Sequence, residues 1–224
     1  DTTPIGSTYK GIELFEHPPN GHGATANLIL NMLKHFDVAN MSPFGTERTH
    51  IEAEVTKLAY DTRNRLIGDA DFTTRLDHML APETAAALAA LVNPTRAMGD
   101  PTALSEQVHK DTIYITVVDR DGMAVSMIYS IFHGFGSGIA TDKYGILLHN
   151  RGAGFTLEEG HPNELKANKR PMHTIIPGML AKDGKPFMPF GVMGGAYQAT
   201  GHSRCVTNFD DFGLAARASL ASPR

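Results

Sequence analysis

The chain has 224 residues, of which 42% are hydrophobic and 20% are charged, a composition that suits one large folded domain rather than a disordered chain. Its formal net charge of -4 offers no basic field for a nucleic-acid backbone. No apolar run approaches the ~20 residues that a membrane-crossing helix needs, so we expect neither nucleic-acid binding nor a membrane span.

The first part of the chain predicts a strand and then helices. A short strand is expected within residues 9–19, where Pro18-Pro19 stops it. Thr46 is a candidate N-cap for one helix, and Pro82 suits the first turn of another. Apolar residues at helical spacing predict a helix before Thr46 and the helix after it: Leu28, Ile29, Met32, Leu33 and Phe36, and then Ile51, Val55, Leu58, Ala59 and Leu66.

The pattern changes near the middle of the chain. Residues 93–111 contain several breakers and little periodicity, which predicts a mobile connector that tolerates a cut. The run Ile113–Val118 is rich in β-branched residues and predicts a strand. Asp121-Gly122 predicts a tight turn with positive φ angles, and Met123–Ile131 the return strand of a hairpin.

The last third predicts a second hairpin and a helix. Residues 174–180 and 187–192 are expected to be strands around a turn at 182–185. Residues 206–218 are expected to be helical, although Gly213 weakens the pattern. Helices, then strands, then a helix indicate a mixed α and β fold with helices packed on a sheet.

Disulfide and metal chemistry are not expected. Cys205 is the only cysteine, so no internal disulfide can form, and a buried structural role is its default. The 11 histidines form no His-Glu-x-x-His pattern, and there are no paired cysteine ligands. The sequence implies no cofactor.

Thr112 alone is an ordinary residue at the head of a strand, but it lies in an ordered set of motifs. From Asp111 the chain reads Asp-Thr-x-Tyr-x-x-Val-Val-Asp-x-Asp-Gly-x-Ala-Val-Ser. This run resembles the start of the small subunit in the γ-glutamyltranspeptidase family. Later blocks are similar to that family's blocks and keep its order over nearly the whole chain: Phe135–Ile139, Gly145–Leu148, Asn168–Pro171 and Met193–Gly195.

The resemblance implies an α+β fold, the αββα sandwich of the N-terminal-nucleophile hydrolases, here as a partial copy. Residues 1–111 would be the end of the large subunit, mainly helical, and residues 112–224 the front of the small subunit, mainly strands. The rest of the precursor is then one expected partner. A sheet edge left exposed by truncation favours pairing with a second copy, so a homo-oligomer is another. Much of the family is periplasmic or secreted, but no signal peptide is visible here and the compartment stays open.

A threonine hydroxyl becomes a nucleophile only when a base takes its proton. The α-amine of an N-terminal threonine can do so, because its unperturbed pKa is roughly 7.7–8.0. Catalysis by Thr112 therefore requires hydrolysis of the Asp111–Thr112 bond, which the same hydroxyl can start by attacking the Asp111 carbonyl. The resemblance further implies that the Ser130 hydroxyl holds the amine of the nucleophile in place and orients it, and that Gly194 and Gly195 form the oxyanion hole.

Substrate recognition is where the sequence departs from the γ-glutamyl-specific members. Arg151 and Gly154 match the positions of groups that grip the substrate's α-amine in those members, and Phe132 matches an asparagine of the same pocket. His173 and Thr174 match two serines that bind the α-carboxylate. Because the Arg151 cation repels an ammonium and attracts a carboxylate, the pocket suits an acyl group with a terminal carboxylate, such as glutaryl. Asn150–Gly152 and Gly160–Asn163 are similar to the cephalosporin-acylase-like branch.

Three functions are therefore open. The main expectation is an autoprocessed amidohydrolase resembling glutathione hydrolase, which cleaves γ-glutamyl amides and passes the acyl group to water or to an acceptor amine. The second is a glutaryl acylase on the same scaffold. The third is a catalytically silent fragment, against which the presence of Thr112, Ser130 and both glycines argues. A small-molecule amide is the expected substrate of either enzyme.

Overall fold

A computed structural model describes residues 2–99 and 110–223. The helices and strands are α1 (Gly23–Leu33), α2 (Thr46–Leu66), α3 (Leu76–Leu80), α4 (Pro82–Ala89), α5 (Tyr197–Asp210), α6 (Ala216–Ala221), β1 (Ile5–Tyr9), β2 (Ile12–Glu16), β3 (Lys110–Val118), β4 (Ala124–His133), β5 (Gly178–Lys182) and β6 (Lys185–Phe190). None of the described helices combines the length and the apolar composition that a bilayer crossing demands.

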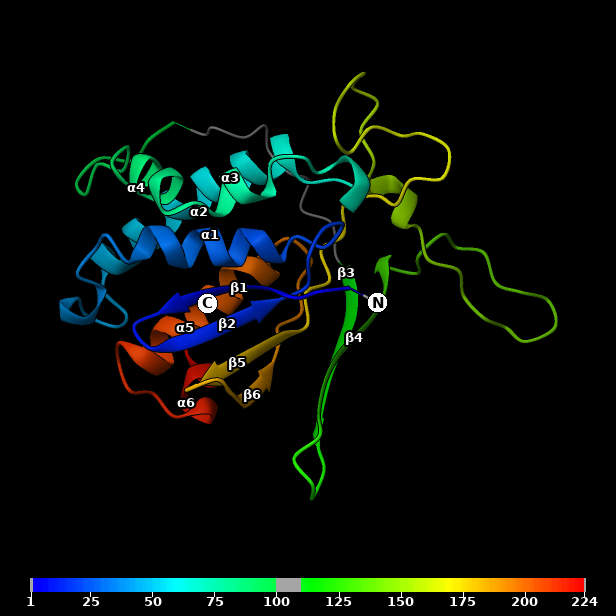
Figure 1. Cartoon of the computed structure of the whole chain (residues 1–224). Coiled ribbons are helices and arrows are strands. Elements are labelled where there is room, and N and C mark those ends of the chain that lie inside the picture. The colour runs from blue at the N-terminus through cyan, green and yellow to red at the C-terminus, as the bar shows by residue number, and fades with distance from the viewer. Residues whose placement is uncertain (1, 100–109, 224) are drawn as a thin grey trace.

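A four-stranded sheet with helices layered on it forms the body of the molecule (Figure 1). The strand order is β1-β2-β5-β6, and every neighbouring pair is antiparallel. Helix α1 packs on β1 and β2 and also contacts α5, while α2, α3 and α4 pack against α1 from outside. Because β2 pairs with β5, the segments before and after Thr112 share one sheet.

The alternation of β2 explains which face of the sheet is covered. Ile12, Leu14 and Glu16 are buried, whereas Glu13 and Phe15 between them are partly exposed. Successive strand residues point to opposite faces, so the first set lies under the helices. The buried residues of β2 thus alternate with partly exposed ones, as expected for a strand with one covered face.

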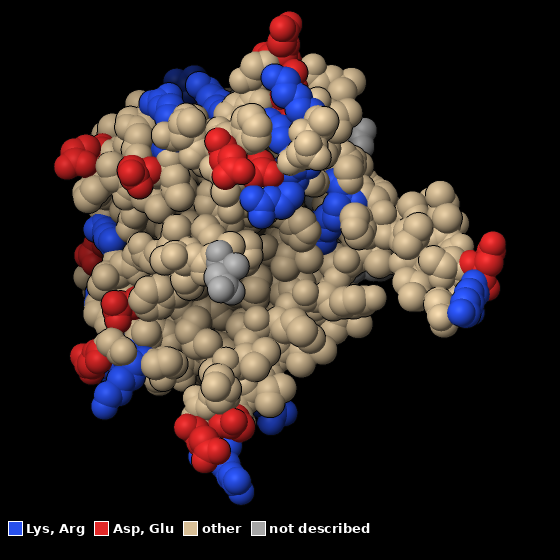
Figure 2. Space-filling view, turned by 45° about the vertical axis from the view of Figure 1, so that its right-hand side comes forward, with Lys and Arg blue, Asp and Glu red and all other residues tan. Residues whose placement is uncertain are grey.

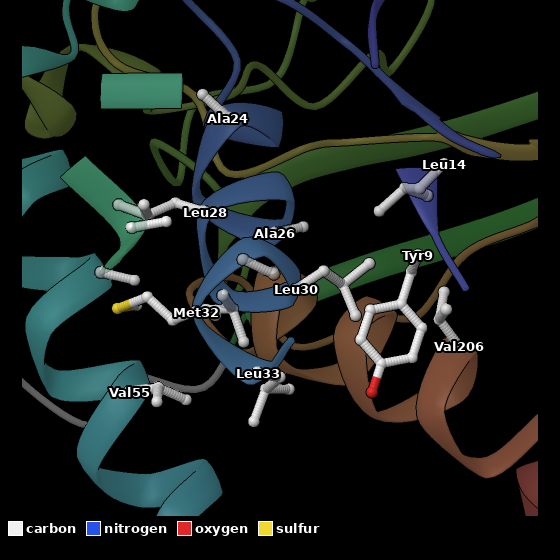
Figure 3. Close-up of a cluster of buried hydrophobic side chains, with 14 of the residues drawn as sticks. Tyr9, Leu14, Ala24, Ala26, Leu28, Leu30, Met32, Leu33, Val55 and Val206 are labelled. Carbon is white, nitrogen blue, oxygen red and sulfur yellow. The ribbon is translucent and has the colours of Figure 1, made fainter. Parts of the chain in front are cut away.

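Helix α1 lies at the centre of the hydrophobic core, between α2 on one side and β1 with α5 on the other (Figure 3). Nearly all of its residues are buried, including Leu28, Leu30 and Met32. A helix that is apolar around its whole circumference is expected only where other elements surround it. The core combines residues of both halves of the chain, as Leu30 and Val206 show.

Strands β3 and β4 form a separate hairpin that projects from the body (Figure 1). Their register pairs Thr112 with Ser130 and Val118 with Ala124. The odd-numbered residues of β4 are exposed up to Tyr129 and its even-numbered residues are partly buried, the alternation of a strand with one covered face. The partly buried face is the one that includes Ser130, and it meets β6.

Several expected elements are confirmed with changed bounds. The first helix, the helix that Pro82 begins and the two hairpins are present. The short strand expected within 9–19 is β2. It forms a hairpin with β1, which was not expected, and the chain turns at Lys10 and Gly11, both with positive φ. Thr46 is the first residue of α2, and Gly45 takes the N-cap position.

Other expectations were wrong in detail. The connector expected over 93–111 ends before Lys110, where β3 begins, so Thr112 lies inside the strand; most of the connector falls outside the described residues. Of the Asp121-Gly122 pair only Gly122 has a positive φ, and the Asp119 carboxylate accepts the N–H groups of Asp121 and Met123 within the turn. The strand expected over 174–180 begins only at Gly178.

The last helix was also misplaced. The helix expected over 206–218 is α5, which begins at Tyr197, followed by α6. Gly213 separates the two with a φ of 61°, a conformation that glycine adopts without strain. The weak position in the pattern is therefore a true break between helices.

Candidate active site

Thr112 and Ser130 face each other across the β3–β4 hairpin. The Thr112 hydroxyl donates a hydrogen bond to Ser130 Oγ over 3.1 Å. Ser130 Oγ in turn accepts the backbone N–H of Phe132 at 3.0 Å. The expected nucleophile and its expected holding residue are thus in direct contact, and Ser130 ties Thr112 to the end of β4.

The hairpin is irregular at this point. The register shifts between Asp111 and Thr112, because Asp111 pairs with Phe132 whereas Thr112 pairs with Ser130, which leaves Ile131 as the extra residue. Phe132 has a φ of 79°, an unusual conformation for a bulky residue. Such irregular backbone is concentrated at functional sites, and here it lies opposite the Asp111–Thr112 bond.

The face of the hairpin that carries Thr112 packs on the end of β6. The Tyr114 and Ser126 hydroxyls are 2.9 Å apart, and Ser126 donates to the Phe190 carbonyl over 3.3 Å. The Tyr114 ring lies so close to Gly191 that a Cβ there would come within 2.6 Å of it. The chain can therefore continue past β6 beside the hairpin only with glycine at this position.

Gly194 and Gly195 follow a few residues later and form the turn into α5. Their φ angles are 125° and 58°, which glycine adopts without strain. Their carbonyls accept the N–H groups of Tyr197 and Gln198 at 3.2 and 3.1 Å. Within residues 2–99 and 110–223, no hydrogen bond joins Thr112 to either glycine. The hairpin instead contacts this segment at Gly191, where the Tyr114 ring packs.

Arg151 is the buried cation of the site. It begins a short 3-10 helix (Arg151–Gly154), is 6% exposed, and its guanidinium lies 4.6 Å from the centre of the Phe132 ring. Its Nη1 donates to Thr174 Oγ1 over 3.3 Å, while its Nε has no hydrogen-bond partner among the described residues. Burial lowers the Arg151 pKa to about 10, so the group stays charged at neutral pH.

His173 and Arg151 line the same cleft, which has a volume of about 530 Å³. Figure 2 shows a hollow in this face of the molecule, with Lys and Arg side chains above it. Burial, and then the charge of Arg151, lower the His173 pKa to about 4, so this imidazole is neutral at pH 7. The cleft therefore presents Arg151 as a charged group and His173 as an uncharged one.

Backbone contacts fix the wall of this cleft. The His173 N–H donates to the Asn20 carbonyl at 2.7 Å, and the Asn20 side chain donates to the Pro171 carbonyl at 2.7 Å. Arg170, on the same wall, is bound to the Asp69 carboxylate. The sequence analysis missed Asn20 and Asp69, since neither stands in a motif that carries chemistry.

Gly154 and Thr174 lie beside this cleft, as the motif positions suggest. The Gly154 carbonyl accepts a hydrogen bond from the Asn163 side chain at 2.6 Å, which fixes the loop after Arg151. Thr174 is buried with its hydroxyl toward Arg151. The structure thus brings together Thr112 with Ser130, and Arg151 with His173 and Thr174, as two neighbouring groups joined at Phe132.

The described residues contain no group of His, Cys, Asp or Glu side chains arranged to hold a metal ion. Cys205 lies in α5, partly buried, and burial raises the pKa of its thiol. A thiol of raised pKa is a poor nucleophile. The hydroxyl groups of the hairpin are therefore the better candidates for acyl transfer.

Comparison with known proteins gives a consistent result. The sequence profile of the family described as Gamma-glutamyltranspeptidase matches residues 2–224. The Glutathione hydrolase-like YwrD proenzyme of Bacillus subtilis is 34% identical over 99% of this chain and 42% of its own length. The Glutathione hydrolase proenzyme of Escherichia coli is 30% identical over 100% of this chain and 41% of its own length.

A solved structure agrees in fold as well as in sequence. The cephalosporin acylase of Bacillus halodurans superposes with a TM-score of 0.87 and is 35% identical, over 99% of this chain and 40% of that protein. The chain thus spans less than half the length of these relatives.

Proposed function

The chain belongs to the γ-glutamyltranspeptidase family, and from this membership we propose that its full-length protein is an autoprocessed amidohydrolase with Thr112 as nucleophile. Its fold is part of the αββα sandwich of the N-terminal-nucleophile hydrolases. The described sheet with α1 and α5 is one half of such a sandwich, and the β3–β4 hairpin projects beyond it. The proposed reaction is cleavage of a γ-glutamyl amide, with release of the acyl group to water or to an acceptor amine.

The observation that carries the proposal is the contact between Thr112 and Ser130 at the irregular point of the hairpin. The Thr112 hydroxyl lies next to the bond that must break, and Ser130 fixes its direction. The unusual backbone of Phe132 supports the same assignment. Among the described residues, Thr112 and its partner Ser130 are the hydroxyl-bearing residues that border this irregularity.

Processing would begin with the uncleaved chain. The Thr112 oxygen attacks the Asp111 carbonyl carbon, the C–N bond breaks, and the hydroxyl proton passes to the departing nitrogen. The product is an ester between Asp111 and the Thr112 side chain, with a free α-amine on Thr112. Water then hydrolyses the ester, which leaves Asp111 as a carboxylate at one chain end and Thr112 at the other.

Turnover would use the same oxygen. The freed α-amine takes the hydroxyl proton while the oxygen attacks the substrate amide, and the proton then passes to the leaving amine. The N–H groups of the Gly194-Gly195 turn are proposed to stabilise the negative oxygen of the tetrahedral intermediate, a role in which one donor is typically worth ~2.7–4 kcal/mol. Water or an acceptor amine releases the acyl group from the ester.

The test is the turnover of γ-glutamyl anilide by the full-length protein and by two variants. Thr112→Ala removes the oxygen and should abolish turnover, whereas Thr112→Ser keeps a hydroxyl and should retain part of it. Equal turnover by Thr112→Ala and the parent would eliminate Thr112 as nucleophile. If the unaltered full-length protein did not turn over the anilide, a catalytically silent protein would be favoured instead.

A second candidate, a glutaryl-type acylase, is favoured by Arg151. Its buried guanidinium has no carboxylate partner among the described residues. Its Nη1 donates a hydrogen bond to the uncharged hydroxyl of Thr174. Desolvated cations are expected to be paired, so a substrate carboxylate is a fitting partner. The solved relative named as a cephalosporin acylase is consistent with this candidate.

The two candidates differ in the α-amine of the acyl group. We expect the ratio of kcat/KM for glutaryl anilide to that for γ-glutamyl anilide to exceed one if Arg151 governs the pocket. A ratio well below one would favour the γ-glutamyl reading, because the extra ammonium would then be recognised rather than repelled.

A further inference from the structure

Tyr60 of α2 is bound to the residue that directly follows the glycine pair. Its hydroxyl donates a hydrogen bond to the Ala196 carbonyl and lies 3.0 Å from Thr200 Oγ1. Ala196 is the N-cap residue of α5, and Thr200 lies one turn into that helix. Tyr60 thus holds the start of α5 from a helix that precedes Thr112 in the sequence by about fifty residues.

The start of α5 and the glycine turn are one continuous piece of backbone. The carbonyls of Gly194 and Gly195, which precede Ala196, accept hydrogen bonds from the N–H groups of Tyr197 and Gln198, which follow it. The turn also has no side chains of its own to fix it. A contact that fixes Ala196 therefore fixes the direction in which the glycine N–H groups point.

Tyr60 is itself held firmly. The Arg63 guanidinium, one turn further along α2, lies 4.5 Å from the centre of the Tyr60 ring. Arg63 Nη1 is 3.3 Å from His22 Nδ1, and the His22 N–H donates to the His173 carbonyl at 2.9 Å. One side of α2 therefore contacts Ala196, next to the glycine turn, and is linked through His22 to His173 in the wall of the cleft.

We propose that Tyr60 is a positioning residue for the oxyanion donors, supplied by the segment that precedes the cleavage point. This inference rests on the proposed function, since it needs Gly194 and Gly195 to act as the oxyanion hole. Its consequence is that the part of the chain before Thr112, which shares the sheet and the core with the part after it, sets the geometry of the turn that stabilises the tetrahedral intermediate. Tyr60 itself touches no reacting atom.

The test compares Tyr60→Phe with a matched control in the full-length protein. Tyr9→Phe removes another hydroxyl of the same core, one that donates to Asp211 at 2.7 Å and forms no hydrogen bond with a candidate site residue in the part of the chain that the structure describes. Tyr60→Phe should lower kcat at least tenfold with KM changed less than twofold. Tyr9→Phe should leave both constants within twofold of the parent, even if both variants melt at lower temperature.

The kcat of each variant is calculated per molecule of processed and folded protein. Intact mass gives the processed fraction, and the thermal unfolding transition gives the folded fraction. A loss of folded protein therefore does not count as a loss of kcat. A kcat for Tyr60→Phe within twofold of the parent would overturn the inference, as would equal losses of kcat in the two variants. Turnover that survives Thr112→Ala would instead overturn the proposed function. An inactive Thr112→Ala beside a fully active Tyr60→Phe would remove only the role of Tyr60.

Discussion

The Asp69 carboxylate accepts three hydrogen bonds from Arg170, one from the backbone N–H at 2.6 Å and two from the guanidinium at 3.1 and 3.0 Å. The two residues lie on opposite sides of Thr112 in the sequence. Asp69 is almost fully buried, and Arg170 begins the wall of the cleft that continues to Pro171 and His173. This ion pair therefore links the two segments that cleavage would turn into two chains.

The ion pair between Asp69 and Arg170 predicts that the stability of the fold depends on pH. The Arg170 guanidinium, followed by backbone N–H groups, lowers the Asp69 pKa from 3.8 to about 2. A carboxyl with a lowered folded-state pKa stabilises the fold above its unfolded pKa of ~3.9, and this contribution is lost as the pH falls toward 2. Since Arg170 is largely exposed, we expect Asp69→Asn to cost about 1–2 kcal/mol at pH 7.

Urea unfolding at pH 7 and at pH 3 measures this effect. The difference between the parent and Asp69→Asn should be smaller at pH 3 than at pH 7. Below the unfolded pKa of ~3.9 the Asp69 carboxyl of the unfolded parent takes up a proton, whereas the folded parent keeps its carboxylate down to a pH of about 2. Asp71→Asn is the control, because Asp71 lies two residues away and its side chain forms no hydrogen bond or ion pair with Arg170 among the described residues. A difference that grows on acidification would contradict the assigned role of Asp69.

Ser130 should matter for both processing and turnover. Ser130→Ala removes the acceptor for the Thr112 hydroxyl and for the Phe132 N–H. Loss of a hydrogen-bond partner in a partly buried site typically costs about 1–3 kcal/mol, roughly a 5- to 150-fold loss of rate if it is felt in the transition state. Ser130→Thr keeps the hydroxyl and should recover most of the rate.

Ser126→Ala is the matched control for Ser130, since Ser126 lies on the same face of β4 four residue pairs further along the hairpin. Its effect should fall on stability, through the contacts with Tyr114 and Phe190, more than on the rate of processing. The time course of cleavage, followed by gel, separates the two. Equal rates of cleavage in the Ser130→Ala and Ser126→Ala variants would speak against a role for Ser130 in holding Thr112.

Arg151→Met should separate stability from recognition. Replacing a buried cation that lacks a carboxylate partner by an apolar side chain is expected to leave the free energy of unfolding unchanged or to raise it by about 1 kcal/mol. The same change should lower kcat/KM for glutaryl anilide about 10- to 100-fold, because the substrate carboxylate loses its charged partner. Turnover of uncharged butyryl anilide should stay within threefold.

Arg170→Met provides the contrast, because Arg170 is paired with Asp69 and its loss should destabilise the fold. Thermal melts and kcat/KM on the two anilides cover both variants. If Arg151→Met lowered the turnover of the charged and uncharged substrates alike, Arg151 would be a structural residue and the carboxylate preference would have to come from elsewhere.

Local patterns were sufficient to predict much of the fold. The apolar spacing in α1, the β-branched residues of β3 and Gly122 each act within a few residues, so their elements could be predicted from the sequence. The start of α5 could not, because its first turns carry polar residues that are buried only through distant partners. His202 is paired with Glu16 at 2.6 Å, and Gln198 accepts the Ile176 N–H at 3.2 Å.

The candidate site divides in the same way. Thr112, Ser130 and Arg151 stand in motifs, and each could be named from the sequence. Tyr60 and Asp69 act on residues more than a hundred positions away, at Ala196 and Arg170, and nothing in their surroundings marks them. Such contacts depend on how α2 and its following loop pack, which no periodicity encodes.

The central claim is that the Thr112 oxygen cuts its own chain. Intact-mass measurement of the full-length protein, incubated after purification alongside Thr112→Ala, tests it most directly. We predict two new masses in the parent, one of a chain that begins at Thr112 and one of a chain that ends at Asp111, with a single uncut mass in the variant. A parent that stays uncut, or a variant that is cut at the same bond, would contradict it.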